Sequence, residues 1–345
     1  MLLPDRNVTY RNVFVLDSRD WYATCRDRFD PATDLILTYD LALKLEIESQ
    51  GGKAFFVDHL LQSEVMQDNN FRLYEFFRTW HTDASGADIF VYRGVPFGFS
   101  FRMDIWNELV FYVRARLCLE ILRTLRFETL SVGTELGLAE IIISEMGMPF
   151  IPIRPDTTAS RPSYYFPIHR WMTEHIRRQG LKARVLNIAT WGIGTLLSWW
   201  DRAQPRWRRR AAVFVQPYHP TFGVIRRLRK EGRVRVVTAT ISADVRWSRY
   251  VPVWGRTAPF QSVAAELLDD FRRKRTARLV LSTGIDVTDG VYRIVEKSIA
   301  PRMGASLRTM ECILRYVDKN PIRLELLIAN IGEIASLVGC VCKAR

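Results

Sequence analysis

The chain has 345 residues, of which 48% are hydrophobic and 25% are charged. This composition excludes a disordered or fibrous protein, and the length exceeds the ~150 residues expected for one domain, so we expect two domains. Fifty Lys and Arg against 37 Asp and Glu give a formal net charge of +13. This charge favours phosphate-bearing partners such as nucleic acid, sugar nucleotides or anionic lipid, without choosing among them.

The five cysteines are scattered and odd in number, which favours a reducing compartment over a disulfide framework. Cys340 and Cys342 form a C-x-C pair with no second pair and no nearby His, so a zinc site would lack half of its ligands. We therefore expect no bound metal. The first ten residues include Asp5 and Arg6 and no apolar core long enough for export, which predicts a cytoplasmic protein without a cleaved signal peptide.

Short apolar runs alternate with helical patterns through the first half of the chain. The predicted strands are residues 12–16, 35–39, 54–57, 89–92, 129–132 and 149–153. The predicted helices between them are residues 41–50, 64–80, 105–125 and 135–146. Because this alternation is typical of βαβ units, we predict a mostly parallel sheet with helices on both of its faces.

A Pro-rich stretch at residues 154–167 marks a boundary, followed by a predicted helix, a Trp-rich apolar segment and a basic run at 168–179, 185–200 and 206–210. A second βα series follows. Its predicted strands are 212–216, 234–240 and 324–329, and its predicted helices are 222–230, 261–274, 291–319, which is long or broken, and 332–342. The fold class is therefore α/β, with two Rossmann-like units at 1–155 and 211–345 joined by a helical, Trp- and Arg-rich connector at 156–210.

The second series stops on a helix where another parallel strand would normally follow. We therefore expect either a fragment or a short member of a larger family.

Ligands of open α/β sheets bind beyond the carboxyl ends of the strands, so the residues that follow each predicted strand are the first candidates. Asp17 and Arg19 follow one strand of the first unit. Asp17, Asp40 and Asp58 could together form a carboxylate cluster at one sheet edge. Aspartates at strand ends are also common turn formers, and we favour that interpretation for at least two of the three.

Gly133, Thr134 and Glu135 open a predicted helix directly after a strand. Free backbone N–H groups at such a position can receive a phosphate or a sugar hydroxyl. The alternative is an ordinary helix cap, which we favour for Thr134 taken alone.

In the second unit, a strand runs into Tyr218, His219 and Thr221 at a strand-to-helix junction, which is the best single site candidate. With an ordinary pKa of ~6.5, His219 can serve as a general base or hold phosphate, or it can simply hydrogen-bond the loop. Asn330 and Glu333 follow the last strand. Glu333 is a candidate catalytic carboxylate, although an acidic residue in a first helical turn is also favoured by the helix dipole.

Neither unit contains a G-x-G-x-x-G or G-x-x-x-x-G-K-[ST] motif, so a dinucleotide cofactor and a P-loop have no support. No Ser/His/Asp order and no paired histidines at metal-ligand spacing stand out.

The Trp-rich segment has about 16 residues and contains Asn187, two glycines and Ser198, so it is shorter and more polar than the ~20-residue apolar helix that crosses a membrane. Three interpretations remain. They are a buried helix followed by a solvated basic linker, which we slightly favour, docking on an anionic inner-membrane surface, and nucleic-acid binding. Nucleic-acid binding ranks last because the charge is concentrated in one run and the sequence has no recognisable nucleic-acid motif. The residues assigned to the membrane surface are Trp199, Trp200, Trp207, Arg208, Arg209 and Arg210.

The sequence resembles bacterial surface-carbohydrate biosynthesis proteins, a diffuse group of GT-B-like glycosyltransferases for capsule or O-antigen. The resemblance rests on the stretches 35–40, 213–219 and 250–252 and on the region around Asn330 and Glu333. It covers most of the chain loosely.

This resemblance implies transfer of a sugar from a nucleotide-sugar donor to a glycan or lipid-linked acceptor. It implies acceptor binding in the N-terminal domain and donor binding in a C-terminal one, with no metal or other cofactor, because helix dipoles and basic side chains can stabilise the departing phosphate. The chain ends where that donor domain would be expected to begin. The alternative function is therefore a non-catalytic acceptor-binding or scaffold subunit that docks at the inner membrane surface.

Overall fold

The computed structural model describes residues 3–16, 18–133, 138–154, 181–205, 210–217, 219–238, 248–251, 253, 255–320, 322–327 and 333–345. Contacts divide the chain into two units, which are described separately. Unit 1 comprises Met1–Arg78, Trp106–His175 and Arg278–Val295, and unit 2 comprises Thr79–Ile105, Ile176–Ala277 and Glu296–Arg345. Each unit is thus assembled from three separate stretches of the chain.

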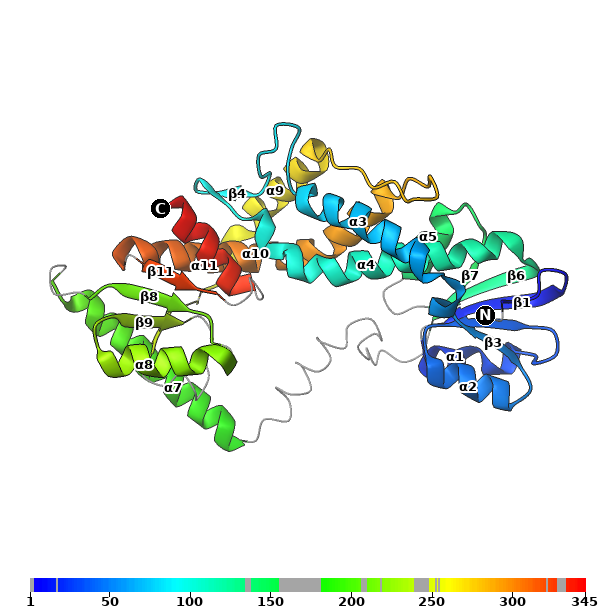
Figure 1. Ribbon diagram of the computed structural model, residues 1–345, viewed down its shortest axis with the longest axis horizontal. Coiled ribbons are helices and arrows are strands. Elements are labelled where there is room, and N and C mark those ends of the chain that lie inside the picture. Colours follow the sequence, from blue (N-terminus) through cyan, green and yellow to red (C-terminus); the bar gives the residue numbers. More distant parts are fainter. Residues whose placement is uncertain are drawn as a thin grey trace. The chain divides into compact units, whose positions relative to one another are not determined.

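Unit 1 is built on a five-stranded parallel sheet with the order β3-β2-β1-β6-β7 (Figure 1). Its strands are β1 (Thr9–Leu16), β2 (Leu35–Thr38), β3 (Lys53–Phe56), β6 (Arg126–Gly133) and β7 (Ile151–Pro152). The chain moves outward from β1 to β3 and then returns to the other side of β1. This is the order of a Rossmann-like sheet, with a topological switch point between β1 and β6.

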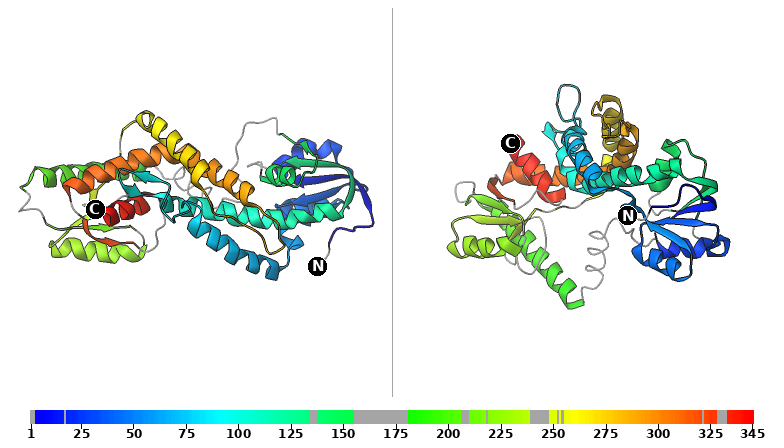
Figure 2. Two further views of the ribbon diagram at one scale, coloured as in Figure 1. Left: turned by 90° about the horizontal axis from the view of Figure 1, so that it is seen from above. Right: turned by 45° about the vertical axis from the view of Figure 1, so that its right-hand side comes forward.

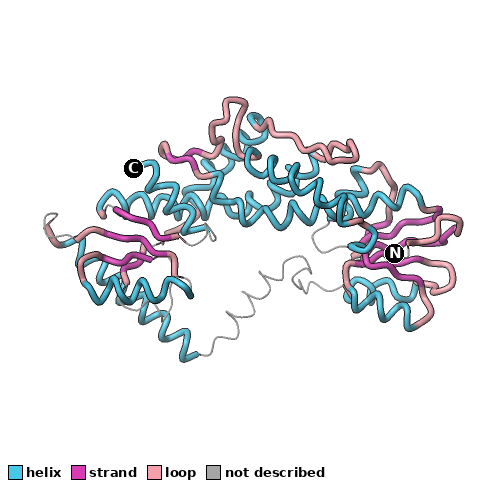
Figure 3. The backbone as a smooth tube through the Cα atoms, in the orientation of Figure 1, coloured by secondary structure: helices cyan, strands magenta, loops and turns pink. Residues whose placement is uncertain are grey.

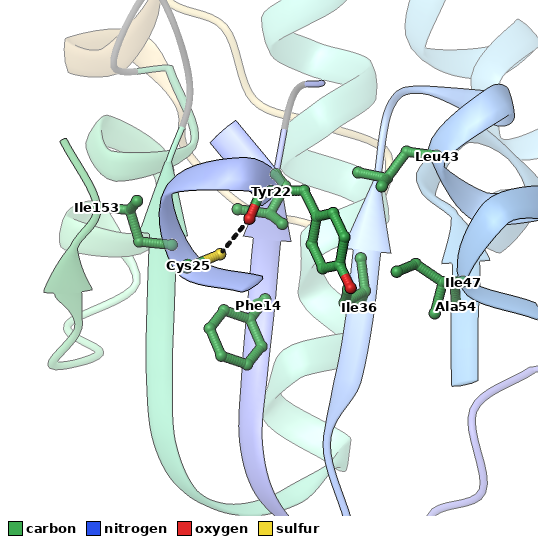
Figure 4. Close-up of a cluster of buried hydrophobic side chains, with 9 residues drawn as sticks. Phe14, Tyr22, Cys25, Ile36, Leu43, Ile47, Ala54 and Ile153 are labelled. Carbon is green, nitrogen blue, oxygen red and sulfur yellow. Dashed lines mark hydrogen bonds between the residues drawn. The ribbon is translucent and has the colours of Figure 1, made fainter. Parts of the chain in front are cut away.

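The helices of unit 1 lie on both faces of this sheet, as the alternating pattern predicts. They are α1 (Arg19–Cys25), α2 (Leu41–Ser49), α3 (Ser63–Thr79), α4 (Arg102–Leu119) and α5 (Leu138–Glu145), with 3-10 turns η1 (Arg26–Arg28), η2 (Val57–Leu60) and η4 (Glu120–Thr124). Figure 4 shows how α1 and α2 cover one face: Phe14 and Ile36 of the strands meet Tyr22, Leu43 and Ile47 of the helices.

Unit 2 contains a second parallel sheet, with the order β10-β9-β8-β11 (Figure 3). Its strands are β8 (Ala212–Val215), β9 (Arg235–Thr238), β10 (Arg249–Tyr250) and β11 (Ile322–Leu326). The order again moves outward from the first strand and returns to its other side, so a second switch point lies between β8 and β11. Both parallel sheets predicted from the sequence are therefore present.

The helices and 3-10 turns of the remaining chain are α7 (Leu181–Ala203), α8 (Phe222–Glu231), α9 (Gln261–Lys274), α10 (Thr288–Lys319), α11 (Glu333–Ala344), η3 (Gly98–Phe101), η6 (His219–Thr221) and η8 (Ala258–Phe260). The prediction of a long or broken helix is resolved in favour of one continuous helix, although Pro301 lies inside α10. The predicted helix at 168–179 lies outside the described residues.

The strand predicted at 89–92 does not join either parallel sheet, and in this respect the prediction was wrong. Two of its residues form β4 (Val91–Tyr92), which pairs antiparallel with β5 (Val95–Pro96) in unit 2. Arg93 and Gly94 both have positive φ angles, 50° and 77°. A two-residue connection of this kind closes a tight hairpin, so the chain turns back before it can cross to a parallel neighbour.

The Trp-rich segment forms α7, one helix whose N-terminal turns extend away from the unit 2 sheet in Figure 1 and in the right-hand view of Figure 2. Its C-terminal half packs on β10 through Gly194, where a Cβ atom would overlap the Tyr250 ring. Gly192 lies two residues earlier on the same helix, and a Cβ atom there would meet no other atom within 4 Å. Among the described helices, none is both long and apolar enough to cross a membrane.

These two glycines provide a matched test of the α7–β10 packing. Gly194→Ala is expected to destabilise the protein by about 2 kcal/mol or more, because the added methyl group must displace a buried tyrosine ring. Gly192→Ala is expected to stabilise it by up to about 1 kcal/mol, because alanine favours the helix and meets nothing. Urea denaturation of the two variants measures both effects, and equal effects at both positions would contradict this packing.

A buried histidine lies in unit 2 beside the β4–β5 hairpin. His81 is 7% exposed, packs against Trp80 and Phe99, and has no hydrogen-bond partner for Nδ1. Burial lowers the pKa of His81 to about 4. The imidazole is therefore neutral in the folded protein at pH values where it would be charged in the unfolded chain.

The pKa of His81 predicts a loss of stability in acid. Its neutral state contributes stability above the unfolded pKa of about 6.5, and this contribution is lost as the pH falls through the folded pKa. Relative to His81→Phe, which keeps an aromatic ring but cannot titrate, the wild type should lose about 3 kcal/mol between neutral pH and pH 4. Parallel stability–pH curves of the two proteins, measured by chemical denaturation, would contradict this assignment.

Candidate functional site

At the switch point of unit 1, β1 and β6 end side by side, with Leu16 paired to Gly133. A Cβ atom on Gly133 would lie 2.6 Å from the Trp21 ring, so the absence of a side chain here is explained by close packing against α1. Arg19 forms an ion pair with Glu46, with 3.0 Å between Nε and Oε2. Arg19 is thus held by α2. Asp17, Thr134 and Glu135 lie outside the described residues.

At the switch point of unit 2, β8 and β11 end side by side, and the Gln216 N–H donates to the Leu326 carbonyl oxygen at 3.1 Å. The buried Thr221 hydroxyl donates to the Gln216 carbonyl oxygen at 2.7 Å. Thr221 therefore stabilises the turn after β8. His219 begins η6, four residues after β8 ends, and Glu333 begins α11, seven residues after β11 ends. Their side chains, and Tyr218 and Asn330 entirely, lie outside the description.

The structure describes only some of the residues that the sequence assigned to a membrane surface. Trp199 and Trp200 on α7 are 50% and 66% exposed. Arg210 is exposed and donates a hydrogen bond to the Gly232 carbonyl oxygen. Trp207, Arg208 and Arg209 lie outside the described residues.

Two of the three strand-end aspartates now have distinct roles. The Asp40 carboxylate accepts hydrogen bonds from the backbone N–H groups of Ala42 and Leu43 at 2.9 and 3.2 Å, so it caps α2. The turn-forming interpretation is therefore correct for Asp40. Asp58 makes no such cap and instead lines a cavity.

This cavity, of about 960 Å³, lies in unit 1 beyond the carboxyl end of β3. Charged and polar side chains line it from separate parts of the chain: Asp58 and His59 from η2, Lys44 from α2, and Arg114 from α4. The rest of its polar lining consists of Glu48 of α2, Gln62, and Ser63, Gln67 and Asn70 of α3. The cavity is large enough for a sugar-sized ligand.

Asp58 is the most strongly perturbed group of this cavity. Its side chain is 17% exposed, and Oδ1 lies 2.9 Å from Nε of Arg114. Neither atom has a hydrogen-bond partner, because the Nε–H bond is not directed at the oxygen. The contact is therefore an ion pair without a hydrogen bond.

Burial is the largest influence on the Asp58 carboxyl and raises its pKa, while the charges of Arg114 and His59 act in the opposite direction and do not offset it. Burial also raises the pKa of the neighbouring Cys118 thiol, to about 12, and the Asp58 charge is the second cause of this rise. A carboxylate whose charged form is poorly solvated is a stronger base than an exposed one. Among the described residues that line this cavity, Asp58 is thus the carboxylate whose environment suits it to accept a proton from a ligand hydroxyl.

The sequence identified Asp58 as a strand-end aspartate but did not show whether it forms a turn or belongs to a binding site. Arg114 lies 56 positions further along the chain, inside an apolar helical pattern, and no local signal connects it to a strand end. Only the crossing of α4 over the sheet brings the two charges together.

A second cavity, of about 970 Å³, lies in unit 2 and is lined largely by arginine and lysine. Arg210, Arg235 and Arg249 reach it from the amino ends of β8, β9 and β10, opposite to the edge where Rossmann-like sheets bind ligands. The sequence analysis identified Arg210 as a candidate but not the other basic residues of this cavity. The four basic residues at 226, 227, 229 and 230 within one predicted helix were the available signal.

Among the described side chains, no group of three His, Cys, Asp or Glu residues is arranged to hold a metal ion. No protein-family model matches the chain, and no curated protein is significantly similar to it. The architecture of two Rossmann-like units with parallel sheets is consistent with a GT-B-like fold.

Because its environment disfavours the charged carboxyl, Asp58 is expected to add nothing to stability at neutral pH. A carboxyl whose pKa is raised on folding contributes stability below its unfolded pKa and loses it as the pH rises through the folded pKa. Asp58→Asn should therefore leave the midpoint of thermal unfolding at neutral pH unchanged or raised. A clear fall in that midpoint would mean that the ion pair with Arg114 is mainly structural.

Proposed function

We propose that this protein is a glycosyltransferase-like protein of cell-surface polysaccharide assembly. It transfers a sugar from a nucleotide-sugar donor to a glycan or a lipid-linked acceptor. The observation that carries the proposal is the pair of parallel sheets, each with its own switch point, in a chain that lacks the Gly-rich loops of dinucleotide and P-loop proteins.

The cavity beside Asp58 supports an acceptor site in unit 1. A hydroxyl group bound there would donate its proton to the Asp58 carboxylate while its oxygen attacks the anomeric carbon of the donor sugar. The bond from that carbon to the diphosphate oxygen breaks, and the nucleoside diphosphate leaves with the electron pair. Arg114 stabilises the charge of Asp58 before the proton moves, and His59 supplies a second polar group at the cavity.

For the donor, we propose the carboxyl edge of the unit 2 sheet, at the switch point between β8 and β11. His219 and Glu333 begin the elements that follow these two strands, and both keep their predicted roles as catalytic candidates. Tyr218 and Asn330, with Asp17, Thr134 and Glu135 of the first unit, remain predicted substrate-binding residues. No cofactor besides the donor substrate is part of the proposal.

The first test is a thermal-shift screen of the full chain against UDP-, GDP- and dTDP-linked sugars, free nucleotides and short oligonucleotides. A ligand that binds only the folded state raises the melting temperature, and we expect one nucleotide-sugar class to do so. With that donor, Asp58→Asn should keep the thermal shift and lose about 100-fold or more of the transfer rate, which is what removal of a general base costs.

Asp40→Asn is the matched control, because it alters a strand-end aspartate that caps a helix, and asparagine caps equally well. It should transfer sugar like the wild type. If no nucleotide or nucleotide-sugar changes the melting temperature, the proposal of a complete enzyme fails, and a non-catalytic acceptor-binding or scaffold subunit becomes the better account.

A further inference from the structure

Helix α7 presents large apolar side chains to solvent, the reverse of an ordinary surface helix. Residues three and four apart share one face of a helix, so these side chains form a single stripe along α7. The α7 stripe, as we call it, consists of Val185, Ile188, Ile193, Leu196, Trp199 and Trp200, all of them exposed.

The opposite face of α7 is buried and carries small or polar residues. Thr190, Thr195, Ser198 and Asp201 are each at most 7% exposed. The Ser198 hydroxyl lies 2.9 Å from the Gly194 carbonyl oxygen and 3.2 Å from that of Tyr250. Turning the helix to bury the stripe would break these contacts and bring bulky side chains against β10, so the packing itself directs the apolar face outward.

The basic cavity of unit 2 adjoins the C-terminal end of this stripe. Trp200 belongs to both, since it lines the cavity and is 66% exposed. The cationic lining consists of Arg210, Arg226, Arg229, Lys230, Arg235 and Arg249. Among the described residues of the lining Asp201 is the only carboxylate, so six positive charges and one negative charge give these residues a formal charge of +5.

Part of this charge is stabilised within the protein. Asp201 forms ion pairs with Arg249 at 2.8 Å and Arg235 at 3.6 Å. Helix α8 ends at the cavity, with Gly232 in the left-handed conformation as its C-cap, and the negative end of its dipole favours the cations of its last turn. Among the described residues of the lining, cations still outnumber carboxylates, so the cavity favours a bound anion.

We propose that the α7 stripe and the basic cavity form one docking surface for a bilayer of anionic phospholipid. The stripe lies in the boundary between headgroups and acyl chains, and the cavity takes a lipid phosphate. The proposal goes beyond sugar transfer and does not depend on it.

Two observations favour a bilayer over a protein partner. The apolar residues run along one exposed helix and include two tryptophans, which prefer the depth of the headgroups. The cations gather at one end of the stripe, as expected of a helix lying in an anionic interface. A protein groove would instead need a matching acidic surface next to an apolar one.

The test is flotation of the full chain with vesicles of phosphatidylcholine alone and of phosphatidylcholine mixed with phosphatidylglycerol. We expect binding to the mixed vesicles that weakens as salt is added, because exposed charges are screened. The stripe variant, Leu196→Ser with Trp200→Ser, should bind the mixed vesicles at least about tenfold more weakly, since two apolar anchors are lost.

The cavity variant, Arg226→Ala with Lys230→Ala, should bind on the order of 30-fold more weakly, because each cation near an anionic surface contributes roughly fivefold. Two controls are matched to these variants. Arg26→Ala with Arg28→Ala removes the same charge from exposed positions of unit 1, and Phe71→Ser removes an aromatic ring that is 78% exposed on α3. Both controls should bind like the wild type, and circular dichroism of every variant checks folding.

Several results would overturn the proposal: no vesicle binding by the wild type, equal binding by the cavity variant and its charge control, or equal binding by the stripe variant and Phe71→Ser. Stabilisation of the chain by glycerol 1-phosphate without vesicle binding would reassign the cavity to a soluble phosphate ligand. Concentration-dependent self-association that the stripe variant abolishes, again without vesicle binding, would reassign the stripe to a second copy of the chain. Loss of vesicle binding leaves the nucleotide-sugar screen unaffected, so the two proposals fail separately.

Discussion

Parallel pairing of one central strand on both of its edges is the constraint on which each unit depends. β1 pairs with β2 and β6, and β8 pairs with β9 and β11. Parallel neighbours need long crossovers, so the helices that cover the sheet are a consequence of this pairing. Where the chain reverses its direction of growth beside the central strand, adjacent crossovers diverge and leave a place for a ligand.

Each unit contains a largely buried aspartate paired with arginine, and the two pairs differ in their hydrogen bonding. In unit 1, Asp58 and Arg114 approach to 2.9 Å without an aligned hydrogen bond, and burial still raises the carboxyl pKa. In unit 2, Asp201 accepts an aligned hydrogen bond from Arg249 and also lies near Arg235. An under-bonded buried charge is expensive to maintain and is typical of sites that do chemistry. A well-bonded one can serve to position its neighbours.

Helix α7 shows how packing geometry can expose apolar surface. Its contact with β10 is closest at Gly194, and only small residues tolerate that approach. Bulky residues are thereby excluded from the buried face and collect on the other side. The same contact that fixes the helix to the sheet also produces the α7 stripe, and the basic residues of α8 and the strand ends lie at one end of it.

Periodicity and turn residues in the sequence determined the fold class, the parallel sheets and most of the described helices and strands, but not α1, β5 or β10. The sequence of β2, for example, begins with an unbroken apolar run, and α2 ends at Ser49, two residues before Gly51, whose φ of +79° suits glycine. Local pattern failed at residues 89–92, because an apolar run does not reveal whether its partner is parallel or antiparallel. Only the tertiary structure decided that Asp58 meets Arg114 and that α7 turns Trp199 and Trp200 outward. Both depend on contacts between residues far apart in the chain, about which local sequence carries no information.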